Sequence, residues 1–220
     1  MKKRILTGAE IIWECIIREN IDVVFGYPGG TILPAYDALN KYRDKIHHVL
    51  VRHEQGATHM ADGYARASGK VGVAMATSGP GATNMVTAAA VAMSNRLPIL
   101  FLPGDTYANR MPDPVLQQVE HFNNPGITAN DAFKPVTRYF DRITRPEQII
   151  QSFPAAIQTM LDPADCGPAC IALSQDIQGQ TFDYPEEFFR EKVHAIRRPR
   201  PYEFQLKEAA EKIKTSKNPI

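Results

Sequence analysis

The chain has 220 residues, and its formal net charge is +1 because 25 Lys and Arg residues nearly balance 24 Asp and Glu residues. This length allows one complete α/β domain plus a short extension, with a core that needs no disulfides or metals. The near-zero charge argues against a nucleic-acid partner, and the lack of a long apolar run argues against a membrane span or a signal peptide. Three cysteines without a disulfide pattern favour a cytoplasmic location.

The apolar pattern predicts helices and strands that alternate along most of the chain. Thr7 and Glu10 form a capping box at the start of a first helix. Short apolar runs predict five buried strands, at 23–25, 48–51, 71–76, 99–102 and 169–173. Further helices are expected from Thr31, over 54–67, from Pro80, behind a second capping box at Thr144 and Glu147, and over 204–213.

This alternation predicts an α/β fold with three layers, α/β/α, around a mainly parallel sheet. Ligands of such sheets bind at the carboxyl ends of strands, which directs attention to the turns at 26–30, 53–55, 77–84 and 103–105. Between Pro103 and Tyr139 the pattern weakens, and so long a loop in a compact domain is usually functional or contacts a partner.

Each glycine-rich or charged turn has a plain structural explanation when taken alone. Two glycines at 29–30 let backbone approach a ligand, but a tight strand–helix turn also uses them. Glu54 could simply cap the first turn of its helix. The glycines and hydroxyl residues at 77–84 could cradle an anion, yet they fit neither the P-loop nor the dinucleotide fingerprint, which disfavours a nucleotide-binding domain.

Together, in this order and spacing, four segments strongly resemble the pyrimidine-binding domain of thiamine-diphosphate-dependent enzymes. They are Gly-Tyr-Pro-Gly-Gly at 26–30, Arg-His-Glu-Gln-Gly-Ala at 52–57, Ala-Asp-Gly-Tyr-Ala-Arg at 61–66 and Ser-Gly-Pro-Gly-Ala-Thr-Asn at 78–84. Residues 1–85 are most similar to the acetolactate synthase large subunits of that family. Residues 88–220 are instead similar to its trihydroxycyclohexanedione hydrolases, on segments that include Leu-Pro-Gly-Asp-Thr at 102–106 and Asn-Asp-Ala-Phe-Lys-Pro at 130–135.

The resemblance implies a role for each of these turns. Glu54 would be the catalytic carboxylic acid that hydrogen-bonds the pyrimidine ring of thiamine diphosphate. The other expected cofactor-binding residues are Gly26, Tyr27, Pro28, Gly29, Thr77, Ser78, Gly79, Pro80, Gly81 and Asn84. Residues expected to face substrate or a neighbouring subunit are Gly30, Asp105 and Gln117.

The resemblance also implies a domain arrangement. Residues 1–185 would form the pyrimidine-binding domain, 186–202 a linker, and 203–220 the start of a truncated central domain. The family's Gly-Asp-Gly…Asn signature does not occur in this sequence. Mg²⁺ and the diphosphate are therefore expected in a domain that this sequence does not contain, with no metal ligand here. The chain would work in a homo-oligomer whose sites lie between subunits, and it would be inactive as an isolated fragment.

Two family reactions stay open at this point. The hydrolase reaction, which opens the ring of a cyclic 1,2-diketone in inositol breakdown, is favoured because its likeness covers the longer part of the chain. The alternative is the acetolactate synthase reaction on pyruvate and other 2-oxo acids, for which FAD would be a possible further cofactor. A non-catalytic α/β partner subunit is the alternative of another class, and Glu54 argues against it.

Overall fold

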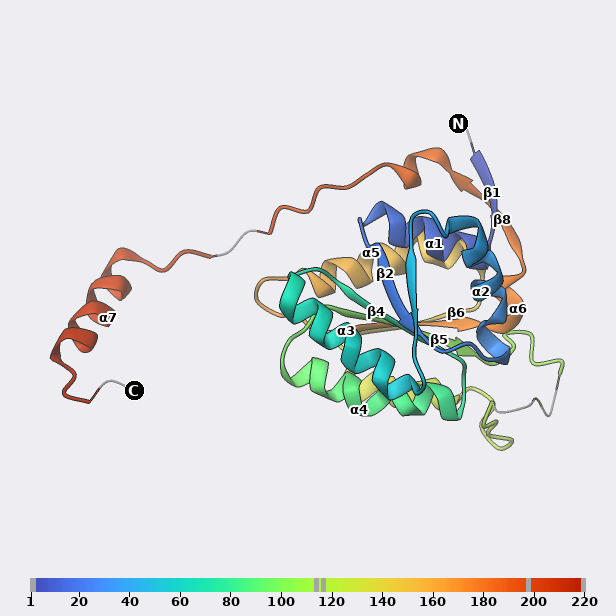
Figure 1. The fold of residues 1–220 in the computed structure, drawn as a ribbon, viewed down its shortest axis with the longest axis horizontal. Helices are drawn as coiled ribbons and strands as arrows, with labels where there is room; N and C mark the ends of the chain where they lie inside the picture. The colour runs from blue at the N-terminus through green and yellow to red at the C-terminus, as the bar shows by residue number, and fades with distance from the viewer. Residues whose placement is uncertain (1–2, 113–114, 116–117, 197–198, 219–220) are drawn as a thin grey trace.

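The computed structural model describes residues 3–112, 115, 118–196 and 199–218, and its centre is a six-stranded parallel sheet (Figure 1). The strand order is β3-β2-β4-β5-β7-β6. The strands are β2 (Val23–Gly26), β3 (His47–Leu50), β4 (Gly72–Ala76), β5 (Ile99–Asp105), β6 (Tyr139–Ile143) and β7 (Ala169–Ser174). All neighbouring pairs run parallel, which confirms the expected sheet and its five predicted strands.

Helices cover both faces of this sheet, so the three layers are present (Figure 1). One face carries α1 (Gly8–Arg18), α2 (Leu33–Leu39) and α5 (Ile149–Met160). The other carries α3 (Glu54–Ser68), α4 (Pro80–Ser94) and the 3-10 helix η3 (Ala129–Val136). Shorter elements complete the domain: η1 (Gly30–Ile32), η2 (Asn40–Tyr42), η4 (Pro146–Gln148) and α6 (Gln175–Gln178).

Side chains of β4 show how the sheet divides the core. Val73 and Met75 pack into the cluster under α1 and α5, whereas Ala74 and Ala76 pack under α3 and α4. Successive strand residues point to opposite faces, so one continuous apolar run serves both layers. On the second face the small residues allow close approach, since a Cβ on Gly72 would lie 2.4 Å from the Ala61 carbonyl oxygen.

Three features of the fold depart from the sequence-based expectations. Strand β6 was not predicted, because its edge position leaves most of its residues only half-buried and removes the apolar run. The capping box expected at Thr144 and Glu147 is wrong: the Gln148 side chain accepts from the Thr144 and Arg145 amides instead. Finally, β1 (Lys3–Thr7) and β8 (Thr181–Pro185) form a separate antiparallel pair.

The first capping box is confirmed, because Glu10 N donates to Thr7 Oγ1 at 3.1 Å and Thr7 N donates to Glu10 Oε2 at 2.9 Å. The segment expected to be a linker, 186–202, begins with η5 (Glu186–Phe189), whose two phenylalanines pack against the core. Helix α7 (Glu203–Thr215) buries no residue and stands apart from the domain in Figure 1. Over the described ranges, no helix is both long enough and apolar enough to cross a bilayer.

Candidate functional site

Glu54 opens α3 at the carboxyl edge of the sheet. Its N-cap is His53, whose Nδ1 accepts a hydrogen bond from Gln55 N at 3.1 Å and so fixes the first turn of the helix. The Glu54 side chain is half-buried, and its Oε2 accepts a 2.9 Å hydrogen bond from Asn84 Nδ2. No described residue hydrogen-bonds the second oxygen, Oε1. One carboxylate oxygen is thus held, and the other can meet a ligand.

Glycines pack tightly around this carboxylate. A Cβ on Gly81 would lie 3.3 Å from Glu54 Oε1 and 2.6 Å from Thr77 Cγ2, and a Cβ on Gly29 would lie 2.6 Å from Thr77 Cβ. Gly79 has a φ of 62°, in the left-handed region that glycine adopts without steric cost. Because larger residues would fill the space, the two glycine turns form a cradle in front of Glu54.

Thr31 ties the glycine turns together. Its hydroxyl oxygen accepts from Ser78 N at 2.7 Å and lies 3.0 Å from Thr77 Oγ1. Gln178 then donates from Nε2 to Thr31 O at 2.7 Å and accepts from Ala35 N at 3.2 Å. Neither Thr31 nor Gln178 was expected to have a role in the site, because the two residues are 147 positions apart and their contact leaves no local sequence pattern.

A tyrosine–histidine pair lies beside the first glycine turn. Tyr36 Oη and His48 Nε2 are 3.2 Å apart, and a Cβ on Gly26 would lie 2.4 Å from that hydroxyl oxygen. Burial, together with the charge of Glu54, raises the pKa of Tyr36. Burial and the neighbouring His47 lower the pKa of His48. Both shifts favour the neutral forms, so this flank of the site carries no charge near neutral pH.

The structure brings together several of the expected cofactor-binding residues. Asn84 and Gly81 lie against Glu54, while Gly81 and Gly29 both lie against Thr77. The others lie on the same two turns: Gly26, Ser78 and Gly79 are buried, whereas Tyr27, Pro28 and Pro80 are exposed. Gly30, expected to face substrate or a subunit, is exposed, and a Cβ at its position would meet no atom within 4 Å. Gln117 lies outside the described residues.

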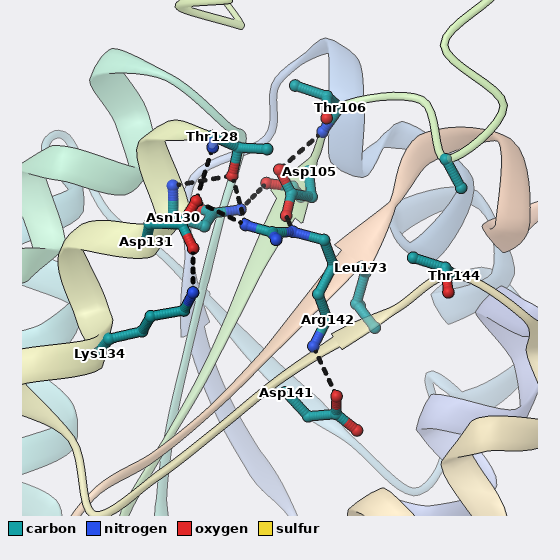
Figure 2. Close-up of polar contacts among 12 residues, drawn as sticks. Asp105, Thr106, Thr128, Asn130, Asp131, Lys134, Asp141, Arg142, Thr144 and Leu173 are labelled. Atoms are coloured by element: carbon teal, nitrogen blue, oxygen red, sulfur yellow. Dashed lines mark hydrogen bonds and ion pairs between the residues drawn. The ribbon is translucent and has the colours of Figure 1, made fainter. Parts of the chain in front are cut away.

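The position of Asp105 differs from the one expected. It was expected to face substrate or a neighbouring subunit, yet it is fully buried, and its Oδ2 accepts a 2.6 Å hydrogen bond from Arg142 Nε (Figure 2). Arg142 also donates to Thr128 Oγ1 at 2.9 Å and to Asp131 Oδ2 at 3.1 Å. Asp105 therefore serves as an internal anchor that fixes the start of the long loop 106–128 against its end.

The described residues around Glu54 do not include a set of side chains suited to bind a metal ion. Glu54 is a single carboxylate, and within the described residues no three His, Cys, Asp or Glu side chains are grouped closely enough to hold a metal ion. The chemistry that the site offers is therefore a single positioned carboxyl group in a cradle of backbone and small side chains.

Comparison with known proteins gives a consistent result. Residues 6–124 match the family model described as "Thiamine pyrophosphate enzyme, N-terminal TPP binding domain". The chain is also similar to proteins named 3D-(3,5/4)-trihydroxycyclohexane-1,2-dione hydrolase. Identity is 47% for the protein from Halalkalibacterium halodurans, 45% for that from Bacillus velezensis and 43% for that from Shouchella clausii, each over 204 residues. These alignments cover 92% of this chain but only 32% of each relative, so the chain spans about a third of the length of these proteins.

Proposed function

The chain belongs to the thiamine pyrophosphate enzymes, and from that membership we propose that it supplies the pyrimidine-binding part of a hydrolase that opens a trihydroxycyclohexane-1,2-dione ring. The observation that carries this proposal is the half-buried Glu54, with one oxygen held by Asn84 and the other bonded by no described residue and facing a glycine cradle.

The residues of this chain fit the pyrimidine end of thiamine diphosphate. Glu54 Oε1 would carry a proton and donate it in a hydrogen bond to a ring nitrogen, while Asn84 keeps the carboxyl group turned toward that nitrogen. The glycine turns leave room for a flat ring close to the backbone. When bound, thiamine diphosphate supplies a carbon nucleophile and an electron sink for C–C bond cleavage.

The remaining parts of the active site would come from outside this chain. Diphosphate and Mg²⁺ would be held by another domain, in a homo-oligomer with sites between subunits, and the isolated chain would be inactive. The three free cysteines support a reducing, cytoplasmic setting. The name that these relatives share favours the hydrolase over acetolactate synthase, for which FAD would be a further cofactor, and over a non-catalytic partner subunit.

A hybrid enzyme tests this function. In it, the chain replaces the aligned third of the Halalkalibacterium halodurans hydrolase. The hybrid is assayed with thiamine diphosphate and Mg²⁺, with the trihydroxydiketone and with pyruvate. We expect ring opening that disappears in the Glu54→Gln hybrid. Carbon dioxide release from pyruvate alone would favour the synthase, and a folded, cofactor-bound hybrid without either activity would favour the non-catalytic subunit.

A further inference from the structure

Buried oxygen atoms without partners gather at one edge of the sheet. Among the described residues, the buried side-chain oxygens with no hydrogen-bond or ion-pair partner belong to Ser78, Gln118, Asn130 and Ser174. Ser78 follows β4, Asn130 donates to the Gly104 carbonyl of β5, and Ser174 ends β7. Buried polar atoms normally have partners, so such a concentration indicates bound water or a ligand at this edge.

Gln118 connects this edge to a cavity. The residue is 1% exposed, and together with Tyr107, Arg110 and His121 it lines a cavity of about 110 Å³ that described residues of the loop 106–128 form among themselves. Its Nε2 donates to Gln175 Oε1 at 3.2 Å, directly after β7, while Thr106 at the end of β5 forms another wall. Because β5 pairs with β4, whose turn carries Thr77 and Gly81, the cavity lies along the same edge as the cradle.

The described residues that form this cavity are anchored at both ends, and two of them have strained backbone. Asp176 accepts from Ala108 N at 2.8 Å, and the Asp105–Arg142 pair anchors both loop ends (Figure 2). Arg110 and Val119 have φ values of 57° and 54°, and a β-branched residue is a clear outlier there. Strain of this kind is usually kept where the conformation serves a site.

The hydrogen-bonding groups that line the cavity indicate which chemical groups a ligand must present. Gln118 Oε1 is an acceptor that no described residue donates to, so a ligand bound there must present a hydrogen. Glu120 adds a carboxylate to the lining and Arg110 adds a guanidinium, so the cavity offers both hydrogen-bond acceptors and donors rather than charge of one sign. Pyruvate and related 2-oxo acids offer only acceptor oxygens near neutral pH. A ring with several hydroxyl groups offers donors to Gln118 and Glu120 and acceptors to Tyr107 and Arg110.

We propose that the cavity lined by Tyr107, Arg110, Gln118 and His121 binds the hydroxyl groups of a polyhydroxylated six-membered ring, with Gln118 Oε1 accepting from one of them. Gln118 then determines which substrate is accepted, while Glu54 serves the cofactor. This inference deepens the proposed function and rests on it for the identity of the substrate.

The first test compares Gln118→Met with the control Gln151→Met in the hybrid enzyme. Methionine keeps the length of the side chain but lacks the acceptor, and Gln151 is exposed on α5. We expect Gln118→Met to raise KM for the trihydroxydiketone about tenfold, as for the loss of one well-made hydrogen bond. The kcat and the dissociation constant of thiamine diphosphate should stay close to those of the control. Equal KM values in the two variants would overturn the inference.

The second test needs no turnover. myo-Inositol, an unreactive hexahydroxycyclohexane, is titrated into the ¹⁵N-labelled 220-residue chain, with pyruvate as the comparison. We expect myo-inositol to shift the Gln118 side-chain amide signals and pyruvate to leave them unchanged. If pyruvate alone shifts these signals, or if myo-inositol does not shift them, the proposal that this cavity binds a polyhydroxylated ring is refuted. If the hybrid opens no ring while myo-inositol still shifts Gln118, the proposed function fails and the cavity assignment stands.

Discussion

The side-chain amide of Asn84 donates a 2.9 Å hydrogen bond to Glu54 Oε2 and so joins the starts of α3 and α4 across 30 positions of sequence. The Asn84 nitrogen must be the donor in this contact, because the NH₂ group of a side-chain amide only donates. The bond therefore fixes the carboxyl plane and directs Oε1 toward the glycine turns.

Glu54→Gln should lower kcat of the hybrid enzyme by about 100-fold or more, in the range that loss of a proton-transferring side chain produces. Glutamine has the same shape and still accepts from Asn84, so the melting temperature should remain near that of the unchanged hybrid. Steady-state kinetics and thermal unfolding measure the two effects. Turnover close to normal would show that Glu54 is only a helix cap.

Asn84→Ala should lower kcat/KM about tenfold, because the one hydrogen bond to the Glu54 carboxyl group is lost and the Glu54 side chain becomes free to rotate. Asn95→Ala is the matched control, since Asn95 lies at the other end of α4 and its side chain bonds only to the Val91 carbonyl among the described residues. Steady-state kinetics of the two variant hybrids measure kcat/KM for each. Equal losses would mean that the effect comes from α4 in general.

The sequence predicted those residues of the site that belong to short local motifs. Glu54 and the two glycine turns are recognisable because each stands where a strand meets a helix. Gln178 and Arg142 act through contacts with residues far away in sequence, so no local pattern assigned them a role. Asp105 was misjudged for the same reason: its position at a strand end suggested exposure, but the partner that buries it comes 37 residues later.

Gln178→Met should destabilise the domain by at least about 2 kcal/mol, because the amides and carbonyls that Gln178 now pairs would be left buried without partners. Trp13, the only tryptophan, is a convenient reporter, since its Nε1 donates to the Ala35 carbonyl at 2.8 Å. Urea unfolding followed by Trp13 fluorescence measures the change. The exposed Gln180→Met is the control, and equal midpoints would contradict the role of Gln178.

The hydrogen bonds around Asp131 predict loss of stability in acid. Burial raises the pKa of Asp131, but hydrogen bonds from Lys134, Thr128 and Arg142 outweigh it and hold the pKa below its ordinary 3.8. The unfolded chain then binds the proton more tightly than the folded one. This contribution is therefore fully present above about pH 4 and is lost as the pH falls through the folded-state pKa. The urea midpoint should drop less between about pH 6 and about pH 3 in Asp131→Asn than in the unchanged chain, and equal drops would exclude Asp131 as a source.

The same glycine-to-alanine change should have opposite effects at two positions. At Gly104 in β5, a Cβ would lie 2.2 Å from Thr31 Oγ1 and 2.9 Å from the Thr31 carbonyl carbon. Thr31 cannot move away freely, because it accepts from Ser78 N and from Gln178. Overpacking of this kind costs about 1–3 kcal/mol.

At Gly63 in the middle of α3, a Cβ would meet no atom within 4 Å and the residue is exposed. Alanine there should stabilise the domain by about 0.5–1 kcal/mol, since it restricts the unfolded chain and favours the helix. Because displacement of Thr31 would also shift Thr77, Gly104→Ala should weaken thiamine diphosphate binding by the hybrid enzyme, whereas Gly63→Ala should leave it unchanged. Urea unfolding and calorimetric titration of the cofactor measure both effects. If Gly104→Ala loses stability but binds the cofactor normally, Thr31 supports the core without shaping the cradle.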